Sequence, residues 1–575
     1  MPVHNSEISD IFGKMADLLE IKGANQFRVR AYRNGALSIS NLSKSLRNMV
    51  SEGVDLTDIE GIGKDLSDKI KEIIETGYLE ELQELELEFP GGLIDILKIQ
   101  GLGPKKVKVL YDELNIGNVD ELRKAAENND IRKLSGFGAK TEENILDGIK
   151  AREEKGEDKR FLFAKAEEFI LSLTEYIKGI NGVNKVTVAG SYRRRKETIG
   201  DIDILVTCKD RDIVMDKFTN YEDVNKVVSQ GNTKSTIILN SGLQVDLRVV
   251  DGESYGSALL YFTGSKAHNV VLRSIAKDKG LKVSEYGIFK GDKNLASKTE
   301  ESVYKKLGLS YIVPELRENN GEVEASKNNQ LPKLVELNDI KGDLQMHSHY
   351  SDGSNTIREM VEAARKMGYE YIAITDHSKR VTMAGGLKRD DVLKQLEEIN
   401  KLNEEYDDIT ILKSIEVDIL KDGTLDLSDD ILKELDLTVC STHYNRNLSR
   451  EEQTKRILAA MENPYFNILA HPTGRIIGKR GEIDVDMEKI IESAKKNNCF
   501  LEINAYPKRL DLSDNYCRLA REMGLKLSIS TDAHSINDLN NMIYGINQAR
   551  RGWQRPEDII NTRSLKELLQ LLKKD

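Results

Sequence analysis

The hydrophobic pattern of this chain changes its period along the sequence, and each change limits what the next segment can fold into. From residue 7 to about residue 150, apolar residues recur at helical spacing, as in ISDIFGKMADLLEI and LSDKIKEIIETG, and glycines interrupt the pattern. From about residue 185, β-rich runs replace it: KVTVAGS, DIDILVT, STIILN and LQVDLRVV. The pattern therefore predicts an all-helical region followed by a mixed sheet.

A third pattern begins after a polar stretch. Residues 315–332, ELRENNGEVEASKNNQLP, contain Gly and Pro but no sustained apolar period, which predicts an interdomain linker. Beyond it, apolar runs such as YIAITD, NILAHP and KLSISTDAH alternate with helical patterns, which is typical of βα units that close into a barrel. Such barrels place their active sites just after the strands.

Length and composition set the broad class. The 575 residues, 39% of them hydrophobic, suggest about four domains at roughly 150 residues each. No segment approaches the roughly 18 consecutive apolar residues of a membrane span, and the N-terminus lacks a signal-peptide pattern, so we expect a cytoplasmic protein without a membrane partner.

Cysteines 208, 440, 499 and 517 are too scattered for a disulfide framework. The net charge of -11 disfavours nucleic acid, but the run Arg193–Lys196 concentrates positive charge locally.

Three G-x-G segments lie between apolar residues in the helical region, each followed by a helical pattern. Glycine allows a tight turn and brings backbone N–H groups against a phosphate at the start of the next helix. A single instance also fits an ordinary capping turn, but three in one region favour helix-hairpin-helix motifs that bind the DNA backbone irrespective of sequence. The glycines are Gly61 and Gly63, Gly101 and Gly103, and Gly136 and Gly138.

Carboxylates are spaced for metal binding in the β-rich region. The segment from Gly190 reads GSYRRRKETIGDIDILV, and alternation along a strand points Asp201 and Asp203 to one side. Asp246, in LQVDLRVV, supplies a third carboxylate from a neighbouring strand. A lone D-x-D is common on exposed strands, whereas a Gly-Ser turn before it favours a nucleotidyltransferase. The three carboxylates therefore predict an Mg²⁺ or Mn²⁺ site for phosphoryl transfer.

The motif YFTGS at residues 261–265, followed by Asn269 and Arg273, makes the sequence resemble the family X DNA polymerases. The resemblance implies an α/β nucleotidyltransferase palm, a thumb, and deoxynucleoside triphosphates as substrates. His268 is expected to be an ordinary histidine on a helix face. By this resemblance the triphosphate is held by Ser191, Arg194 and Gly200, the sugar and base by Tyr261, Phe262, Gly264 and Asn269, and Arg273 probes the new base pair.

The N-terminal region resembles the small lyase domain of these polymerases in FRVRAYR, residues 27–33, and in residues 61–70. The resemblance places Lys69 at the Schiff-base position and Arg28 at the 5'-phosphate. A partly desolvated lysine near other cations has enough free amine to attack a sugar aldehyde. However, Asp65 stands where the family has a lysine, and an exposed helix lysine is an equal alternative for Lys69.

Histidines and carboxylates gather after the predicted strands of the C-terminal region, where they would converge at one barrel mouth and suit Zn²⁺ or Mn²⁺. This region resembles the polymerase and histidinol phosphatase (PHP) family, which implies a TIM-like barrel with up to three metal ions that activate water against a phosphate ester. Gln345 replaces the first histidine of the family motif, and His349 is an extra histidine. The implied ligands are His347, Asp352, His377, Glu416, His443, His471, Asp532 and His534.

These resemblances divide the chain into six parts: a lyase-like helical domain at 1–85, helix-hairpin-helix fingers at 86–152, the palm at 153–250, the thumb at 251–316, a linker at 317–335 and the PHP domain at 336–575. They imply a monomeric polymerase that fills short gaps in gapped or primed double-stranded DNA during base excision repair. The PHP domain is expected to act as a 3'–5' exonuclease, with abasic-site endonuclease or 3'-phosphatase activity as options.

Two other functions fit part of the pattern. A small-molecule nucleotidyltransferase joined to a phosphatase would explain the carboxylates, but the three hairpins and YFTGS argue against it. A catalytically silent scaffold for DNA ends would retain the hairpins, but the intact Asp201, Asp203 and Asp246 argue against that.

Overall fold

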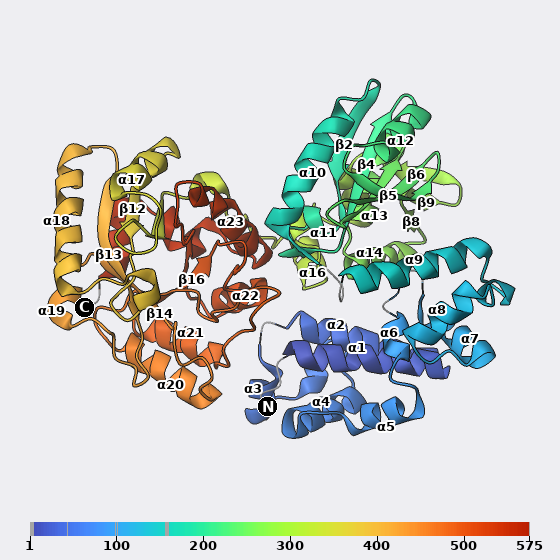
Figure 1. Cartoon of the computed structure of the whole chain (residues 1–575), viewed down its shortest axis with the longest axis horizontal. Coiled ribbons are helices and arrows are strands. Elements are labelled where there is room, and N and C mark those ends of the chain that lie inside the picture. The colour runs from blue at the N-terminus through green and yellow to red at the C-terminus, as the bar shows by residue number, and fades with distance from the viewer. Residues whose placement is uncertain (1–4, 43, 98, 100–101, 156–159, 574–575) are drawn as a thin grey trace. The chain divides into compact units, whose positions relative to one another are not determined.

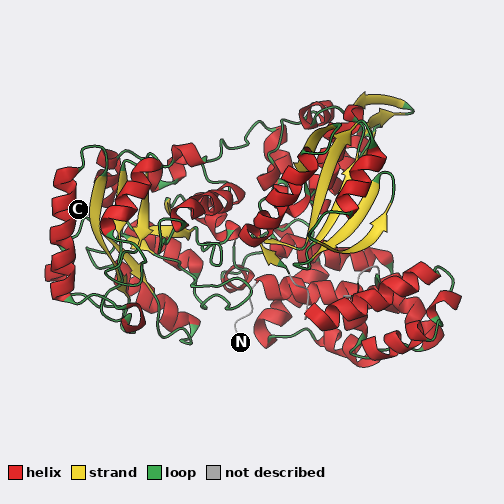
Figure 2. Cartoon of the chain, turned by 45° about the horizontal axis from the view of Figure 1, so that its top comes forward, coloured by secondary structure: helices red, strands yellow, loops and turns green. Residues whose placement is uncertain are grey.

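The chain forms two compact units, Met1–Arg160 and Phe161–Asp575, which are considered separately (Figure 1). The computed structural model describes residues 5–42, 44–97, 99, 102–155 and 160–573. In this described part, the first unit contains helices only, and all strands belong to the second (Figure 2). None of the helices in these ranges is both long and apolar enough to cross a membrane.

The first unit is a helical domain, as the sequence predicts. In α4 the apolar residues Leu66, Ile70 and Ile73 recur at helical spacing and are buried, while the charged residues face outward. One hydrophobic core runs from Ile8 to Ile149 and includes residues of both the lyase-like region and the helix-hairpin-helix region. The helices are α1 (Asn5–Lys22), α2 (Gln26–Ser40), α3 (Leu46–Ser51), α4 (Lys64–Thr76), α5 (Glu80–Glu88), α6 (Leu93–Leu97), α7 (Pro104–Leu114), α8 (Val119–Glu127) and α9 (Ala139–Lys155).

The palm is a mixed five-stranded sheet in the order β2-β4-β7-β6-β5. Its strands β4 and β7 are parallel, and the other neighbours are antiparallel. Helices α10 (Phe163–Lys178) and α12 (Arg211–Thr219) bury Ile170 and Phe218 in the core of this sheet. The strands are β2 (Val183–Val188), β4 (Asp201–Cys208), β5 (Val224–Gln230), β6 (Lys234–Leu239) and β7 (Gln244–Val249), and the short helix α11 (Gly190–Arg193) precedes β4.

The thumb continues into residues that the sequence predicts as a linker. His268 is completely buried, with Nδ1 2.6 Å from Glu322 Oε1 and Nε2 2.9 Å from Tyr304 Oη. Arg317 donates to Glu300 Oε1 at 2.6 Å and is equally buried. Arg317 and Glu322, two polar residues of 317–335, are therefore partners inside the thumb, and His268 is a buried structural histidine. The elements are α13 (Tyr255–Thr263), α14 (Lys266–Asp278), β8 (Lys282–Ser284), β9 (Gly287–Lys290), β10 (Lys293–Ala296), α15 (Glu300–Leu307) and α16 (Glu322–Lys327).

The C-terminal strands form the predicted parallel barrel, with seven strands in sequence order from β11 to β17. The barrel nearly closes, because a parallel bridge joins Met346 to Ala533 and His347 N donates to Ala533 O at 2.8 Å. The strands are β11 (Gly342–Met346), β12 (Tyr371–Ile374), β13 (Thr410–Asp418), β14 (Leu437–Ser441), β15 (Ile468–Leu469), β16 (Phe500–Asn504) and β17 (Leu527–Ser530).

Helices lie around the barrel strands (Figure 1). The last helix packs Leu568 and Leu572 against inward residues such as Leu344 and Tyr371, which leaves the carboxyl ends of the strands for the polar residues. The helices are α17 (Ile357–Lys366), α18 (Arg389–Glu405), α19 (Asp429–Leu432), α20 (Arg450–Met461), α21 (Met487–Lys496), α22 (Asp514–Glu522), α23 (Met542–Arg551) and α24 (Leu565–Leu572).

Candidate functional site

The three palm carboxylates lie on adjacent strands. In the parallel register of β4 and β7, Asp203 lies opposite Asp246, and Asp201 precedes Asp203 by two residues on the same face. A Cβ on Gly190 would lie 3.1 Å from Asp203 Oδ2, so the turn approaches this carboxylate closely because residue 190 is glycine. Burial raises the pKa of Asp203 to about 6, and the charges of Asp201 and Asp246 add to the effect. Clustered carboxylate oxygens suit hard divalent cations, which would relieve the repulsion among the three aspartates.

The predicted triphosphate residues lie at the junction of palm and thumb. Ser191 is in α11, and Gly200 precedes Asp201 at the start of β4. Arg194 already has partners: Nη1 donates to Thr263 O at 2.5 Å, and Nε donates to Glu318 Oε1 at 3.1 Å. A nucleotide phosphate at Arg194 would therefore compete with Glu318.

The YFTGS segment ends α13 and brings most of the predicted sugar and base residues together. Tyr261, Asn269 and Arg273 line one pocket, and Asn269 Nδ2 donates to Tyr261 O at 2.8 Å. Phe262 lies beneath the Arg248 guanidinium, whose carbon is 4.4 Å from the ring centre. Gly264, with φ of 70°, lets the chain turn between α13 and α14.

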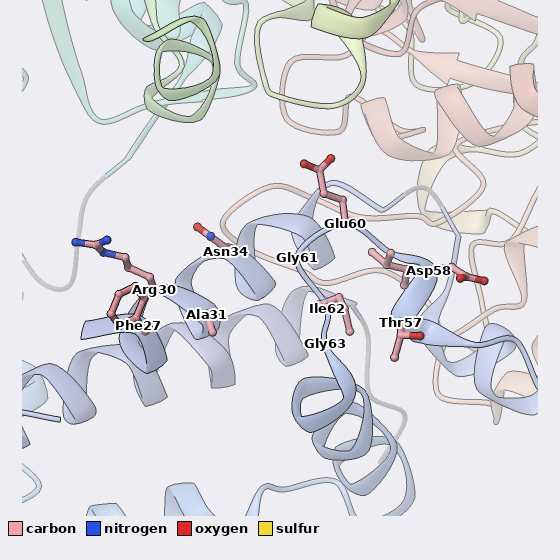
Figure 3. Close-up of a pocket in the computed structure, with 11 residues that line it drawn as sticks. Phe27, Arg30, Ala31, Asn34, Thr57, Asp58, Glu60, Gly61, Ile62 and Gly63 are labelled. Atoms are coloured by element: carbon pink, nitrogen blue, oxygen red, sulfur yellow. The ribbon is translucent and has the colours of Figure 1, made fainter. Parts of the chain in front are cut away.

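The hairpin glycines precede helices in the first unit. Gly61 and Gly136 have positive φ, and Gly63 and Gly103 are the N-cap residues of α4 and α7. Gly138 precedes α9, whereas Gly101 lies outside the described residues. Figure 3 shows a pocket between the first hairpin and α2, lined by Phe27 and Arg30 among others.

Lys69 is held in ion pairs. Its Nζ lies 2.7 Å from Asp65 Oδ1 and 3.3 Å from Glu81 Oε2. Burial opposes the charge of Lys69, but the hydrogen bond to Asp65 and the charges of Tyr32, Glu81 and Asp65 raise its pKa overall. Arg28, which the resemblance places at the 5'-phosphate, also forms an ion pair with Glu81. A raised pKa leaves less free amine for attack on a sugar aldehyde.

The eight predicted PHP ligands converge at the barrel mouth around Glu416. Glu416 Oε2 lies 3.0 Å from His377 Nδ1, and Oε1 lies 3.1 Å from His471 Nε2 and 3.4 Å from His443 Nε2. His349, by contrast, is exposed and lies against Tyr350. Three groups have ligand atoms close enough to share an ion: His347, Asp352, His377 and His534; His377, Glu416 and His443; and His347, Glu416 and Asp532.

The buried imidazole and carboxylate atoms of this cluster fit the role of metal ligands. Within the described residues, His347 Nδ1 is buried without a hydrogen-bond partner, and His377 Nδ1 and Glu416 Oε2 face each other at 3.0 Å without hydrogen-bond geometry. Buried polar atoms normally have a hydrogen-bond partner, because an unpaired buried polar group costs about 1–3 kcal/mol. Burial opposes the charge of His377, yet Glu416 and Asp352 raise its pKa to about 11. The imidazole and carboxylate donor set suits Zn²⁺ or Mn²⁺.

The comparisons with known proteins agree with this division of sites. Matches to family descriptions are Helix-hairpin-helix domain at 3–79, SAM-like Helix-hairpin-helix tandem at 93–151, DNA polymerase beta palm at 164–256, DNA polymerase beta thumb at 258–318 and PHP domain at 343–506. The chain is 39% identical over the full length of both proteins to the DNA polymerase/3'-5' exonuclease PolX of Bacillus subtilis. It belongs to the family X DNA polymerases that carry a PHP domain. This confirms both the resemblance and the multidomain fold.

Other relatives match only part of the length of this family X polymerase. DNA polymerase lambda of Rattus norvegicus is 26% identical over 55% of the chain and 56% of its own length. A probable phosphatase of Thermoanaerobacter sp. is 32% identical over 38% of the chain and 90% of its own length.

Sequence reasoning missed several polar residues at the two sites of this family X polymerase. In the palm, Lys234 Nζ lies 2.7 Å from Asp246 Oδ2, and Thr236 donates to Asp246 Oδ1 at 2.7 Å. In the barrel, Asn504 Nδ2 donates to Asp532 Oδ2 at 3.1 Å, and the buried Gln345 lies beside Glu502. Alternation with apolar residues marks Glu502 and Asn504 in β16, whereas Lys234 and Thr236 in β6 are separated by the polar Ser235 and have no such signal.

Proposed function

We propose that the chain is a DNA-directed DNA polymerase that fills short gaps during base excision repair. The supporting observation is the β4–β7 register, which brings Asp201, Asp203 and Asp246 to one face of the palm. Two Mg²⁺ or Mn²⁺ ions bound there would activate the primer 3'-hydroxyl and neutralise the leaving pyrophosphate. The three carboxylates hold and orient those ions, and Thr236 and Lys234 fix the orientation of Asp246.

In this proposal the palm–thumb junction binds the incoming nucleotide. Arg194 exchanges its ion pair with Glu318 for the triphosphate, beside Ser191 and Gly200. Tyr261, Phe262, Gly264 and Asn269 surround the sugar and base, and Arg273 contacts the nascent pair. Phe262 is packed beneath Arg248, and in this proposal the Tyr-Phe segment beside the sugar excludes a 2'-hydroxyl.

The first unit binds gapped or primed DNA in this proposal. The backbone N–H groups of the helix starts that follow Gly61, Gly63, Gly103, Gly136 and Gly138 contact backbone phosphates, and after Gly103 these lie beyond Pro104, which has no N–H. The chain acts as a cytoplasmic monomer, and its working domains are those named from the sequence, with residues 317–335 packed against the thumb instead of forming a separate linker.

The PHP barrel is proposed to act as a 3'–5' exonuclease with up to three Zn²⁺ or Mn²⁺ ions. The convergence of His347, His377 and Glu416 supports this site, and in the described part of the chain His347 Nδ1 is buried without a hydrogen-bond partner. Bound metals would supply an activated water for attack on the phosphodiester. Gln345 in place of a histidine weakens one metal position, because an amide is a poorer ligand than imidazole for these ions. Abasic-site endonuclease and 3'-phosphatase activities are further uses of the same site.

Primer extension on a one-nucleotide gap tests the polymerase proposal. With Mg²⁺ or Mn²⁺ supplied separately, the wild-type chain should add one nucleotide. The rate of addition by Asp203→Ala should be lower by about 10³-fold or more, because the metals lose a central ligand. DNA affinity, measured on the same substrate, should change little because the hairpins contact DNA through backbone groups. Near-normal extension by Asp203→Ala would rule out the proposed palm site.

A further inference from the structure

Three arginines stand in three successive loops at the mouth of the PHP barrel. Arg446 follows β14 and the predicted ligand His443, Arg480 follows β15 and His471, and Arg509 follows β16. Because the carboxyl ends of parallel strands open at one mouth, these loops border the metal-ligand cluster. Arg446, Arg480 and Arg509 are called the arginine group below.

Contacts with Gly474 bring two of these guanidinium groups together. A Cβ on Gly474 would collide with Arg446 Nη1, and Arg480 donates to Gly474 O from Nε at 3.2 Å and from Nη2 at 2.9 Å. Position 474 must therefore lack a side chain for Arg446 to lie where it does. The same position has φ of 59°, which also favours glycine.

Arg509 joins the group to the metal site. It lines the pocket that contains Glu416 and His534, and its Nε lies 3.7 Å from Asp532 Oδ2. Its backbone is fixed from the neighbouring loop, because Arg475 Nε donates to Arg509 O at 3.0 Å. Arg509 is therefore the member of the arginine group that lies next to the metal ligands.

The outer part of the group forms no direct ion pair among the described residues, and Asp511 is the nearby carboxylate whose charge acts on Arg446. In the described part of the chain, Arg446 and Arg480 have no carboxylate within ion-pair distance, and their hydrogen bonds go to the carbonyls of Gly481 and Gly474. Arg475, between them in sequence, differs because Glu197 lies 2.7 Å from its Nη2. Burial and the nearby charges of Arg480 and Arg509 lower the pKa of Arg446 to about 10.

A further buried cation lies behind this group. Arg456 is 2% exposed, and its Nη2 donates to Tyr444 O at 3.1 Å, in the loop that carries Arg446. Within the described residues, its Nε and Nη1 have no hydrogen-bond partner. The charge of Asp418 acts on Arg456, but guanidinium groups gathered without direct ion pairs are costly unless an anion binds them.

We propose that the arginine group binds the backbone phosphate next to the one cleaved at the metal cluster. This inference rests on the proposed 3'–5' exonuclease activity and names its substrate class: a DNA strand with at least two phosphodiesters at its 3' end. In the reaction, water adds to the terminal phosphodiester, the last nucleotide leaves as a 5'-monophosphate, and the retained strand regains its 3'-hydroxyl. The forked donors of arginine match the oxygens of the retained phosphate.

The test compares two short substrates, a thymidine dinucleotide with one phosphodiester and a trinucleotide with two. In the full-length protein with Mn²⁺, kcat/KM should be about tenfold higher for the trinucleotide, as expected for one charge-assisted phosphate contact. In Arg446→Gln and Arg480→Gln, this ratio should fall towards one. Arg365→Gln is the matched control, because Arg365 pairs with Asp408 away from these loops and should retain the wild-type ratio.

An uncharged analogue of the internal linkage distinguishes a direct contact with that phosphate from a general effect of the substitutions on folding. A methylphosphonate at the internal linkage should lower wild-type cleavage of the trinucleotide about tenfold and should lower cleavage by the two variants no further. A wild-type ratio near one, or a ratio unchanged in both folded variants, would overturn the inference. If inorganic phosphate inhibited only the wild type while the ratios stayed equal, the group would bind free phosphate and not a strand. Failure of the wild type to cleave either substrate would instead refute the proposed exonuclease.

Discussion

Single residues decide which chemistry each site supports, and Lys69 shows this most directly. Its position resembles that of a Schiff-base lysine, but Asp65 and Glu81 hold its ammonium in ion pairs and the pKa is raised. A raised pKa means that the free amine is scarce near neutral pH and becomes available only as the pH rises. The same lysine would be a better nucleophile without Asp65.

We therefore predict that Asp65→Lys increases lyase activity. Replacing the carboxylate by a cation removes a charge that stabilises the ammonium and adds one that destabilises it, so the pKa of Lys69 falls. The borohydride-trapped adduct with a 5'-deoxyribose phosphate end should form at least several-fold faster at neutral pH than in the wild type. Lys69→Ala in the Asp65→Lys background should abolish trapping. Equal trapping by wild type and Asp65→Lys would contradict this role for Asp65.

The palm carboxylates could be predicted from the sequence because their signal is local. Two aspartates two residues apart on one strand must share a face, whatever the rest of the fold does. The partners of Arg194 could not be predicted, since Glu318 and Thr263 are far away in sequence and no local pattern links them. For the same reason, the burial of His268 against Glu322 has no sequence signal.

At the scale of elements, α23 of the barrel joins the PHP domain to Arg194, which we propose binds the nucleotide. Arg551, at its end, is 7% exposed and donates to Arg194 O at 2.9 Å, to Glu318 Oε1 at 3.0 Å and to Asp514 Oδ2 at 2.5 Å. Glu318 in turn pairs with Arg194. A polar stretch that indicates a linker in the sequence is thus part of a charged contact between thumb and barrel.

Arg551→Met should destabilise the second unit and weaken nucleotide binding. Removing one partner of a buried ion pair costs about 3–5 kcal/mol, because Glu318 and Asp514 lose a common cation. Thermal unfolding should begin at a lower temperature, and the KM for the incoming nucleotide should rise as Arg194 loses its support. Arg555→Met is the control, because Arg555 is more exposed and pairs with Asp558 and Glu557. Similar unfolding temperatures for both variants would show that Arg551 is not a structural link.

At the scale of the whole molecule, two metal sites lie in separate cores of one compact unit. The palm carboxylates belong to the five-stranded sheet, and the histidine cluster belongs to the mouth of the seven-stranded barrel. Ion pairs such as Arg475–Glu197 and Arg551–Glu318 connect the two parts. None of the residues in these pairs is a predicted metal ligand, so the chemistry of each site is expected to be independent even though the parts are joined.

The last prediction is that the two activities separate by mutation. His347→Ala or Asp532→Ala should remove 3'-end degradation, since each residue belongs to a group that could hold an ion, while primer extension should remain within about twofold of wild type. Loss of metal can destabilise the barrel, so thermal unfolding of each variant must be compared with that of the wild type before activity is interpreted. Asp203→Ala is the reciprocal variant, expected to lose extension and keep degradation. If degradation persisted in the folded His347→Ala and Asp532→Ala variants but disappeared in Asp203→Ala, hydrolysis would belong to the palm, and the barrel would need another function.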